Sequence, residues 1–192
     1  MPRQFSIYVG FESAAASVHT YETLFVPGLL QTEGYARALV DAHGTSQNEE
    51  DAARRVEARM YRQQLLTGPD APRLHAIVDE AALRRVVGGR EVMHGQLAHL
   101  ADAAQRPNLN VQVVPFTIGA YMPMEGGFII LRFPDADDAD VVCVDLLTRS
   151  LYLDDVGEVE RYRDAWENVL STAATPLDSI KMIKKAAEEL KS

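Results

Sequence analysis

Residues 107–147 read PNLNVQVVPFTIGAYMPMEGGFIILRFPDADDADVVCVDLL, and this stretch decides the fold class. Its runs of β-branched and aromatic residues alternate with turns that contain Pro, Gly and Asp, which is typical of consecutive β-strands. We predict strands at residues 109–114, 128–133 and 141–147, with a short extension at 150–153. Because helical segments flank these strands on both sides, we expect an α+β domain, with an antiparallel or mixed sheet of about four strands and about six or seven helices.

The N-terminal segment, residues 1–44, predicts a helix, an elbow and a second, shorter helix. Apolar residues recur every three or four positions between residues 5 and 19, which indicates an amphipathic helix. An extended stretch then meets Pro27, which disfavours helix in the residue before it, and Gly28, which can supply a positive φ. Two leucines follow in the bend, and Thr32 should cap the short helix after it.

Residues 45–106 predict helices around one strand, and residues 154–192 predict two closing helices. The clearest helix covers residues 47–66, where Ser46 and Glu49 form a capping box. The other elements expected are a strand at 73–78, a helix capped at Asp79, a helix at 91–105, and helices at 156–172 and from Pro176. With the β-rich residues 107–153 between them, these segments are expected to form one domain over residues 1–192.

The composition excludes several classes of protein. The 192 residues are 47% hydrophobic and 24% charged, which suits a single large core. The net charge of -9 repels phosphate, so we expect no direct binding of nucleic acid. One cysteine and the lack of a long apolar run argue against a disulfide framework, a cysteine zinc site and a membrane span, and favour the cytoplasm. We interpret DADDAD, residues 135–140, as a solvated acidic turn in preference to a metal site.

The sequence carries no recognised catalytic motif, such as a nucleophile elbow, a phosphate loop or a zinc-protease helix. Cys143 lies within a predicted strand, where a free cysteine usually behaves as a small buried hydrophobe. The five histidines are scattered and form no pair suited to a metal. We therefore expect no metal and no other cofactor, and we favour a role without catalysis. If the chain is an enzyme, the acid–base candidates are Glu12, Glu80 and Tyr121.

An arginine cluster on the long predicted helix allows two interpretations. Arg55, Arg59 and Arg62 share one helical face in an otherwise acidic chain. They could form a solvated face with local ion pairs. Alternatively, Arg59 and Arg62 pair with carboxylates elsewhere, such as Glu12 or Glu80, or with an anionic ligand, a task that suits the planar guanidinium. The binding candidates on this helix are Arg55, Arg59, Arg62 and Gln63.

The loop TIGAYMPMEGG, residues 117–127, is a second candidate for binding. It places Tyr121, Met122 and Met124 beside glycines, between two predicted strands. These side chains either cover the sheet edge or form an adaptable apolar surface for a partner or ligand.

Five segments together resemble a known family: VPGLLQTEGYARAL (26–39), RVEARMYRQQLL (55–66), DEAALRRVVGG (79–89), QLAHLADAAQRPNLNVQVVPF (96–116) and TPLDSI (175–180). The chain is similar to the C-terminal domain, catalogued as of unknown function, of actinobacterial antitoxin-like helix-turn-helix regulators of the WhiJ type. Members of that family usually carry a DNA-binding helix-turn-helix domain ahead of this region. The present chain begins only a few residues before the match, so we expect it to lack its own DNA reader.

The resemblance implies a sensor or partner-binding domain that also dimerises. The partners it implies are a second copy, a full-length relative in a mixed dimer, a small protein or a small-molecule ligand, and it implies neither a nucleic acid nor a membrane. Our first hypothesis is therefore a regulatory domain without catalytic activity. The alternative is a biosynthetic enzyme or metabolite-binding protein recruited from this regulator domain, with its ligand between the arginine helix and the sheet.

Overall fold

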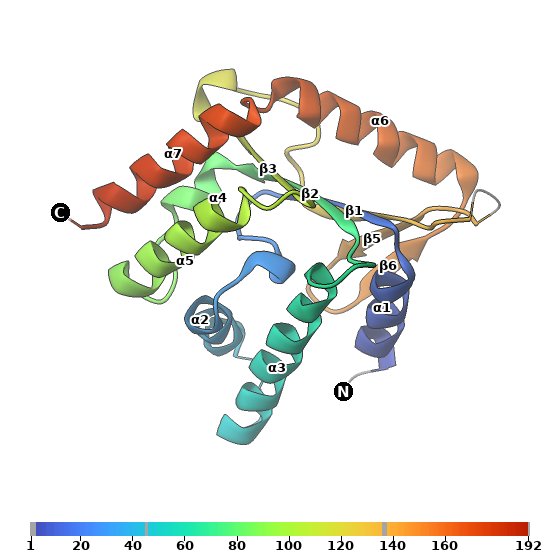
Figure 1. Ribbon diagram of the computed structural model, residues 1–192. Helices are drawn as coiled ribbons and strands as arrows, with labels where there is room; N and C mark the ends of the chain where they lie inside the picture. Colours follow the sequence, from blue (N-terminus) through green and yellow to red (C-terminus); the bar gives the residue numbers. More distant parts are fainter. Residues whose placement is uncertain (1–2, 45, 136–137, 192) are drawn as a thin grey trace.

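A six-stranded mixed sheet runs through the centre of the protein (Figure 1). The computed structural model describes residues 3–44, 46–135 and 138–191. β1 pairs in parallel with β2 and β2 with β3, whereas β1–β4, β4–β5 and β5–β6 are antiparallel pairs. The α+β class is confirmed, and the prediction of about four strands is wrong. In order across the sheet, the strands are β3 (Leu109–Val114), β2 (Arg73–Asp79), β1 (Ser17–Glu22), β4 (Phe128–Arg132), β5 (Val141–Asp145) and β6 (Ser150–Leu153).

Strand β1 is the element that the sequence pattern misassigned. Helix α1 (Arg3–Ala14) ends before the predicted end at residue 19, and β1 begins at Ser17. Ala15 and Val18 are buried, as the apolar pattern suggests, but Ala15 lies in the link after α1 and Val18 lies in β1. Two buried residues three positions apart therefore do not require a continuous helix. β1 lies between β2 and β4, which together satisfy its backbone groups. Pairing with strands far along the chain thus overrides the local helical period.

Helices pack against the sheet through two clusters of buried side chains. The larger cluster joins Val18, Ala76 and Val111 of the sheet to side chains from α2, α4, α5 and α7. The second joins Tyr21, Ile77 and other strand residues to α6, whose Trp166 is only 1% exposed. The helices are α2 (Glu33–His43), α3 (Glu49–Arg62), α4 (Glu80–Arg84), α5 (Arg90–Ala103), α6 (Val156–Thr172) and α7 (Pro176–Glu189), and Figure 1 shows α6 crossing one face of the sheet.

The Pro27 elbow forms a short 3-10 helix, η1 (Gly28–Leu30). The amide of Leu30 donates to the carbonyl of Pro27 at 2.8 Å. Gly28 does not use the positive φ that it can supply, because residues of a 3-10 turn have negative φ. Leu29 and Leu30 lie in the bend, as expected, and both are buried. The side chain of Gln96 then fixes the elbow, since its Nε2 donates to the carbonyl of Leu30 at 2.8 Å.

Helix α3 begins with a different cap from the one predicted. The side chain of Asn48 accepts from the amide of Asp51 at 2.8 Å, whereas the buried Ser46 hydroxyl has no hydrogen-bond partner within the described residues. α3 is also shorter than residues 47–66, because its last turn tightens into a 3-10 helix, η2 (Gln63–Leu66). In contrast, Thr32 caps α2 as predicted, by accepting from the amide of Tyr35.

Strands β1, β2, β3 and β5 all end at one edge of the sheet, which we call the carboxyl edge. β5 belongs to this set because it is antiparallel to β4, which is itself antiparallel to β1. β3 and β4 lie on opposite sides of the β2–β1 pair, so the connection 115–127 must cross the ends of β2 and β1. It contains a third 3-10 helix, η3 (Phe116–Ile118). None of the described helices is both long and apolar enough to cross a membrane.

Candidate functional site

Three strands end in an acidic residue at the carboxyl edge: β1 in Glu22, β2 in Asp79 and β5 in Asp145. The order of the strands changes direction at β1, since β2 and β3 follow on one side and β4 to β6 on the other. In open α/β sheets, ligands bind outside the carboxyl ends of strands at such a switch point. The carboxyl edge is therefore the candidate site, and the loop 115–127 lies across it.

Tyr121 holds this loop on the sheet. Its hydroxyl donates to Asp79 Oδ2 and lies 2.7 Å from the hydroxyl of Tyr21. The other oxygen of Asp79 accepts from the amide of Ala81 at 2.7 Å and caps α4, as the sequence predicted. Burial raises the pKa of Tyr21 to about 12, and burial together with the bond to Asp79 raises that of Tyr121. Tyr121 thus stays protonated at neutral pH and anchors the loop.

Glu80 gives the loop a second anchor. Its Oε2 accepts from the amide of Phe116 at 3.0 Å, while its Oε1 accepts from Nε and Nη2 of Arg84. Both oxygens are therefore occupied by structural contacts. Glu80 was predicted to be an acid–base group or a partner for the arginines of α3. The structure pairs it with Arg84 of its own helix instead.

The anchored loop and the turn from β5 to β6 both carry exposed apolar side chains. Met122 and Met124 are 53% and 50% exposed, and Leu147, in the turn from β5 to β6, is 99% exposed. The prediction that the third strand continues to residue 147 is wrong, because β5 ends at Asp145 and the two leucines that follow lie in the turn. We define the carboxyl-edge surface as the exposed large apolar residues of the loops at this edge: Leu24, Phe116, Ile118, Met122, Met124, Leu146 and Leu147.

A carboxyl group with a raised pKa lies beneath this surface. Burial and the charge of Asp145 raise the pKa of Glu22 from 4.5 to about 7, although Arg59 acts in the opposite direction. The loop packs closely here: a Cβ on Gly127 would lie 2.7 Å from the carbonyl oxygen of Tyr21 and 3.0 Å from Glu22 Oε2. Glu22 was not among the residues singled out from the sequence. The signal that could have found it is that three strands each end in an acidic residue.

The charge of Arg59 acts on this carboxyl group, while its side chain binds the residue that follows the elbow. Its Nη1 donates to Gln31 Oε1 at 3.0 Å, and Gln31 Nε2 donates to the carbonyl of Val26 at 2.7 Å. Burial lowers the pKa of Arg59, while the charges of Asp145 and Glu22 raise it. Gln63, another predicted binding residue, donates from Nε2 to the carbonyl of Gln31. Both predicted residues therefore bind the elbow.

Arg62 forms a buried ion pair with Glu12, which was one of its two predicted partners. Its Nε and Nη2 donate to the two carboxylate oxygens at 2.8 and 2.7 Å. The hydroxyl of Tyr8 also donates to Glu12 Oε1 at 2.7 Å, and the guanidinium carbon lies 4.8 Å from the centre of the Tyr8 ring. Burial, and then the charge of Glu12, raises the pKa of Tyr8 well above 10.0. This ion pair joins α1 to α3. Arg55 lies on the exposed side, where its Nε donates to Asp51 at 3.1 Å.

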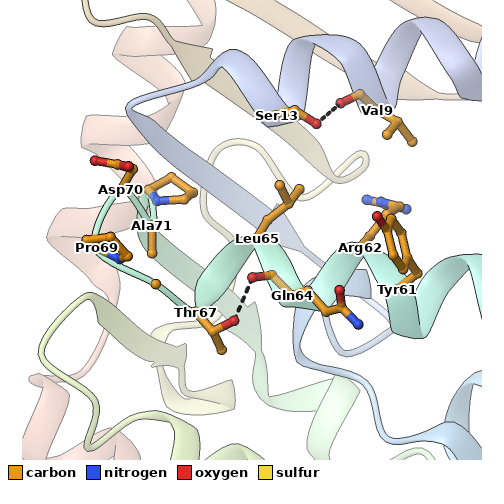
Figure 2. A pocket seen from close by; sticks show the side chains of 12 residues that line it. Val9, Ser13, Tyr61, Arg62, Gln64, Leu65, Thr67, Pro69, Asp70 and Ala71 are labelled. Carbon is orange, nitrogen blue, oxygen red and sulfur yellow. Dashed lines mark hydrogen bonds between the residues drawn. The ribbon is translucent and has the colours of Figure 1, made fainter.

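An open groove of about 410 Å³ lies between α1 and the end of α3 (Figure 2). Figure 2 shows Val9 and Ser13 on α1 facing Leu65 and Arg62 across it, and the turn 67–72 closes one end. No sequence pattern predicted this groove. Because Arg62 is paired with Glu12, its charge in the groove is already balanced.

The described residues contain no group of three or more His, Cys, Asp or Glu side chains that could hold a metal ion. Asp140, from the acidic turn, is buried and accepts from Arg163 Nη2 at 2.6 Å, while Ala136 and Asp137 of that turn lie outside the described residues. Cys143 is 4% exposed, and burial raises the pKa of its thiol to about 12. It is therefore a buried hydrophobe in β5, as predicted, and a poor nucleophile.

A model of a protein family, described as "Domain of unknown function (DUF5753)", matches residues 5–185. Neither the curated proteins nor the solved structures gave a match.

Proposed function

Because the chain belongs to the DUF5753 family, we propose from its geometry that this domain is a regulatory domain which binds a partner protein on the carboxyl-edge surface. The observation that carries the proposal is the set of exposed apolar side chains on loops at one edge of the sheet. Apolar residues gathered at one place on a surface mark interaction sites, and methionine adapts to the shape of a partner. The two anchors, Tyr121 and Glu80, hold this surface ready for binding.

The charges around the carboxyl-edge surface favour a basic partner. Glu125 and Asp145 are exposed there, beside Arg149, on a chain whose net charge is -9. A symmetric pair of identical chains would place these carboxylates against each other. A partner that presents lysine or arginine next to apolar side chains would instead gain complementary contacts. We therefore propose a different, basic protein as the occupant of this surface.

The resemblance to WhiJ-type regulators supports a more specific proposal. In it, the domain is the sensor or partner-binding part of an antitoxin-like actinobacterial transcription regulator, acts in the cytoplasm and does not itself contact nucleic acid. A small basic protein is the partner, while a homodimer and a mixed dimer with a full-length relative are the competing occupants that the experiment below distinguishes.

The test compares two aspartate substitutions on exposed leucines. Leu147→Asp changes the carboxyl-edge surface, and Leu177→Asp changes α7, where the side chain is 65% exposed. The tagged wild-type domain and both variants are used to capture proteins from the source cytoplasm, and the captured basic protein is purified and its binding measured at several salt concentrations. We expect Leu147→Asp to weaken this binding at least about tenfold, Leu177→Asp to leave it unchanged, and added salt to weaken it.

Other results would contradict the proposal. Capture of only the same chain or a full-length relative would show a dimer interface in place of the basic partner. Equal binding by both variants would remove the carboxyl-edge surface from the interaction. A strict monomer that binds random duplex DNA tightly at physiological salt would overturn the regulatory proposal altogether.

Glu22 supports a second candidate function, the binding or conversion of a metabolite. A pKa of about 7 is suited to general acid–base catalysis, and this carboxyl group lies at the switch point of the sheet. Glu12, Glu80 and Tyr121 are less suited, because their polar atoms already make the contacts described above. Incubation of the protein with metabolite extracts, followed by native mass spectrometry and product analysis, tests this candidate. It requires a bound species or turnover that Glu22→Gln abolishes, and it fails if wild type shows neither.

A further inference from the structure

A second group of polar side chains lies at the opposite edge of the sheet, on the face covered by α6. Ser17 is opposite Arg73 on one side and Arg132 on the other. Two residues further along β1, His19 is opposite His75, which is in turn opposite Asn110 of β3. Residues opposite each other in a sheet project from the same face.

Trp166 of α6 holds the two histidines in place. Its ring stacks on that of His19, with centroids 4.8 Å apart and an interplanar angle of 25°, and meets the ring of His75 edge-on at 5.0 Å. His75 Nε2 lies 2.7 Å from Gln112 Oε1, which also accepts from Asn110 Nδ2 at 3.3 Å. These contacts fix both imidazoles on the α6 face.

Both imidazoles are neutral at pH 7. Burial lowers the pKa of His19 to about 4, assisted by the charge of Arg132, and burial also lowers that of His75 despite the bond to Gln112 and the charge of Glu167. A neutral imidazole presents one donor and one acceptor. The Nδ1 of His19 is buried without a hydrogen-bond partner in the described part of the chain, so this ring has an unmet hydrogen bond beside the cavity that His19 lines.

A cavity of about 320 Å³ opens over this group, and Ser17, His19, Arg73, His75 and Asn110 line it. This volume is at the lower end of the range for small-molecule sites. Arg73 is exposed, and within the described residues its guanidinium makes no hydrogen bond or ion pair. The cavity therefore has a free cation at its opening and neutral aromatic rings within it.

Most of the neighbouring charges also favour an anion, with the carboxylate of Glu167, whose charge acts on His75, as the opposing charge. Arg132, on the far side of Ser17, lies 3.5 Å from Asp140, but that carboxylate is already bound more closely by Arg163, at 2.6 Å. One carboxylate thus faces two arginines beside Ser17, and Arg73 adds a third positive charge. Arginine binds carboxylates in a planar, bidentate geometry, which gives the opening of the cavity a preference for that group.

We propose that this cavity binds a small heteroaromatic carboxylate. The carboxylate pairs with Arg73 and accepts from the hydroxyl of Ser17, while the heteroaromatic ring lies against the two imidazoles and its polar atom hydrogen-bonds to the imidazole of His19. This ligand site lies at the opposite edge of the sheet from the carboxyl-edge surface and does not depend on the partner proposed there.

The fluorescence of Trp166, the one tryptophan in the chain, reports on this site directly, because its ring contacts both histidines. The wild-type domain is titrated with nicotinate, and separately with nicotinamide, which has the same ring without the negative charge. We expect a saturable change with nicotinate at or below about 10 mM, and binding of nicotinamide at least about tenfold weaker.

Two arginine variants complete the test. Arg73→Gln should weaken nicotinate binding about tenfold or more, whereas Arg149→Gln, at the opposite edge of the sheet, should leave it unchanged. Circular dichroism establishes that both variants fold. The proposal is overturned if wild type shows no saturable change, if the two variants bind nicotinate equally well, or if nicotinamide binds as tightly as nicotinate.

Discussion

Replacing Arg62 by methionine should destabilise the protein severely, because it removes the cation from a fully buried carboxylate. Glu12 has no exposed side-chain area, Arg62 is 10% exposed, and two charge-assisted hydrogen bonds of 2.7 and 2.8 Å join them. After the substitution, the carboxylate keeps the Tyr8 hydroxyl but loses its positive partner. Breaking a buried pair from one side costs about 3–5 kcal/mol. Arg62→Met should therefore lower the free energy of unfolding by that amount.

The double variant Glu12→Leu with Arg62→Met distinguishes a buried charge from a general loss of packing. With both charges replaced by apolar side chains of similar volume, no unpaired charge stays buried and only the Tyr8 hydroxyl loses its acceptor, so the free energy of unfolding should fall by about 1–3 kcal/mol. With Glu12→Leu alone completing the cycle, the coupling between the two sites should then be at least about 3 kcal/mol. A control is Arg55→Met on the same helix, where the side chain is 41% exposed and the expected loss is below about 1 kcal/mol.

Urea unfolding at pH 7, followed by circular dichroism, gives the free energies for five proteins: the wild type, Arg62→Met, Glu12→Leu, Arg55→Met and the double variant. The reasoning is refuted if Arg62→Met costs no more than Arg55→Met. It is also refuted if the double variant loses as much stability as the two single variants added together, because that result would mean that the pair contributes no coupling.

Three further predictions test the packing around the candidate site. Gly127→Ala should cost about 1–3 kcal/mol, since its Cβ would overlap the carbonyl oxygen of Tyr21, whereas Gly126→Ala, whose Cβ meets nothing within 4 Å, should cost far less in the same urea experiment. Because folding raises the pKa of Glu22 from 4.5 to about 7, its protonated form is favoured in the folded state, and stability should fall by at most about 3 kcal/mol as the pH rises through this range. Glu22→Gln should remove that fall, and an unchanged pH profile would contradict it. Cys143, buried with a raised pKa, should resist iodoacetamide in the native protein and react only after unfolding, as measured by mass spectrometry.

Local sequence signals predicted most of the elements but not their pairing. The strands after residue 107 and the helices from Asp79 onward follow from turn residues, caps and apolar periods, which act within a few positions. Strand β1 was not predicted, because it is stabilised by pairing with β2 and β4, which are distant in the sequence. The cap at Asn48 was missed for a smaller reason, since Ser46 two residues earlier offers the same chemistry.

The contacts of the candidate residues were predictable where a buried charge requires a partner of opposite charge. A buried arginine needs a carboxylate, and Glu12 was one of two partners foreseen for Arg62. Glu22 could not be ranked above other acidic residues, because its raised pKa depends on Asp145 and on a loop that crosses the sheet. The exposure of Leu147 was not predicted, because Leu146 and Leu147 follow the apolar strand residues and have the pattern of a continuing strand.

Hydrogen–deuterium exchange of the purified domain, alone and with the captured basic partner, tests the proposed partner interface most directly. We predict slower exchange over residues 115–127 and 146–149 in the complex, with no change over α7. Unchanged exchange in these two loops, with protection over residues 61–72 beside the groove of Figure 2, would contradict the proposed interface.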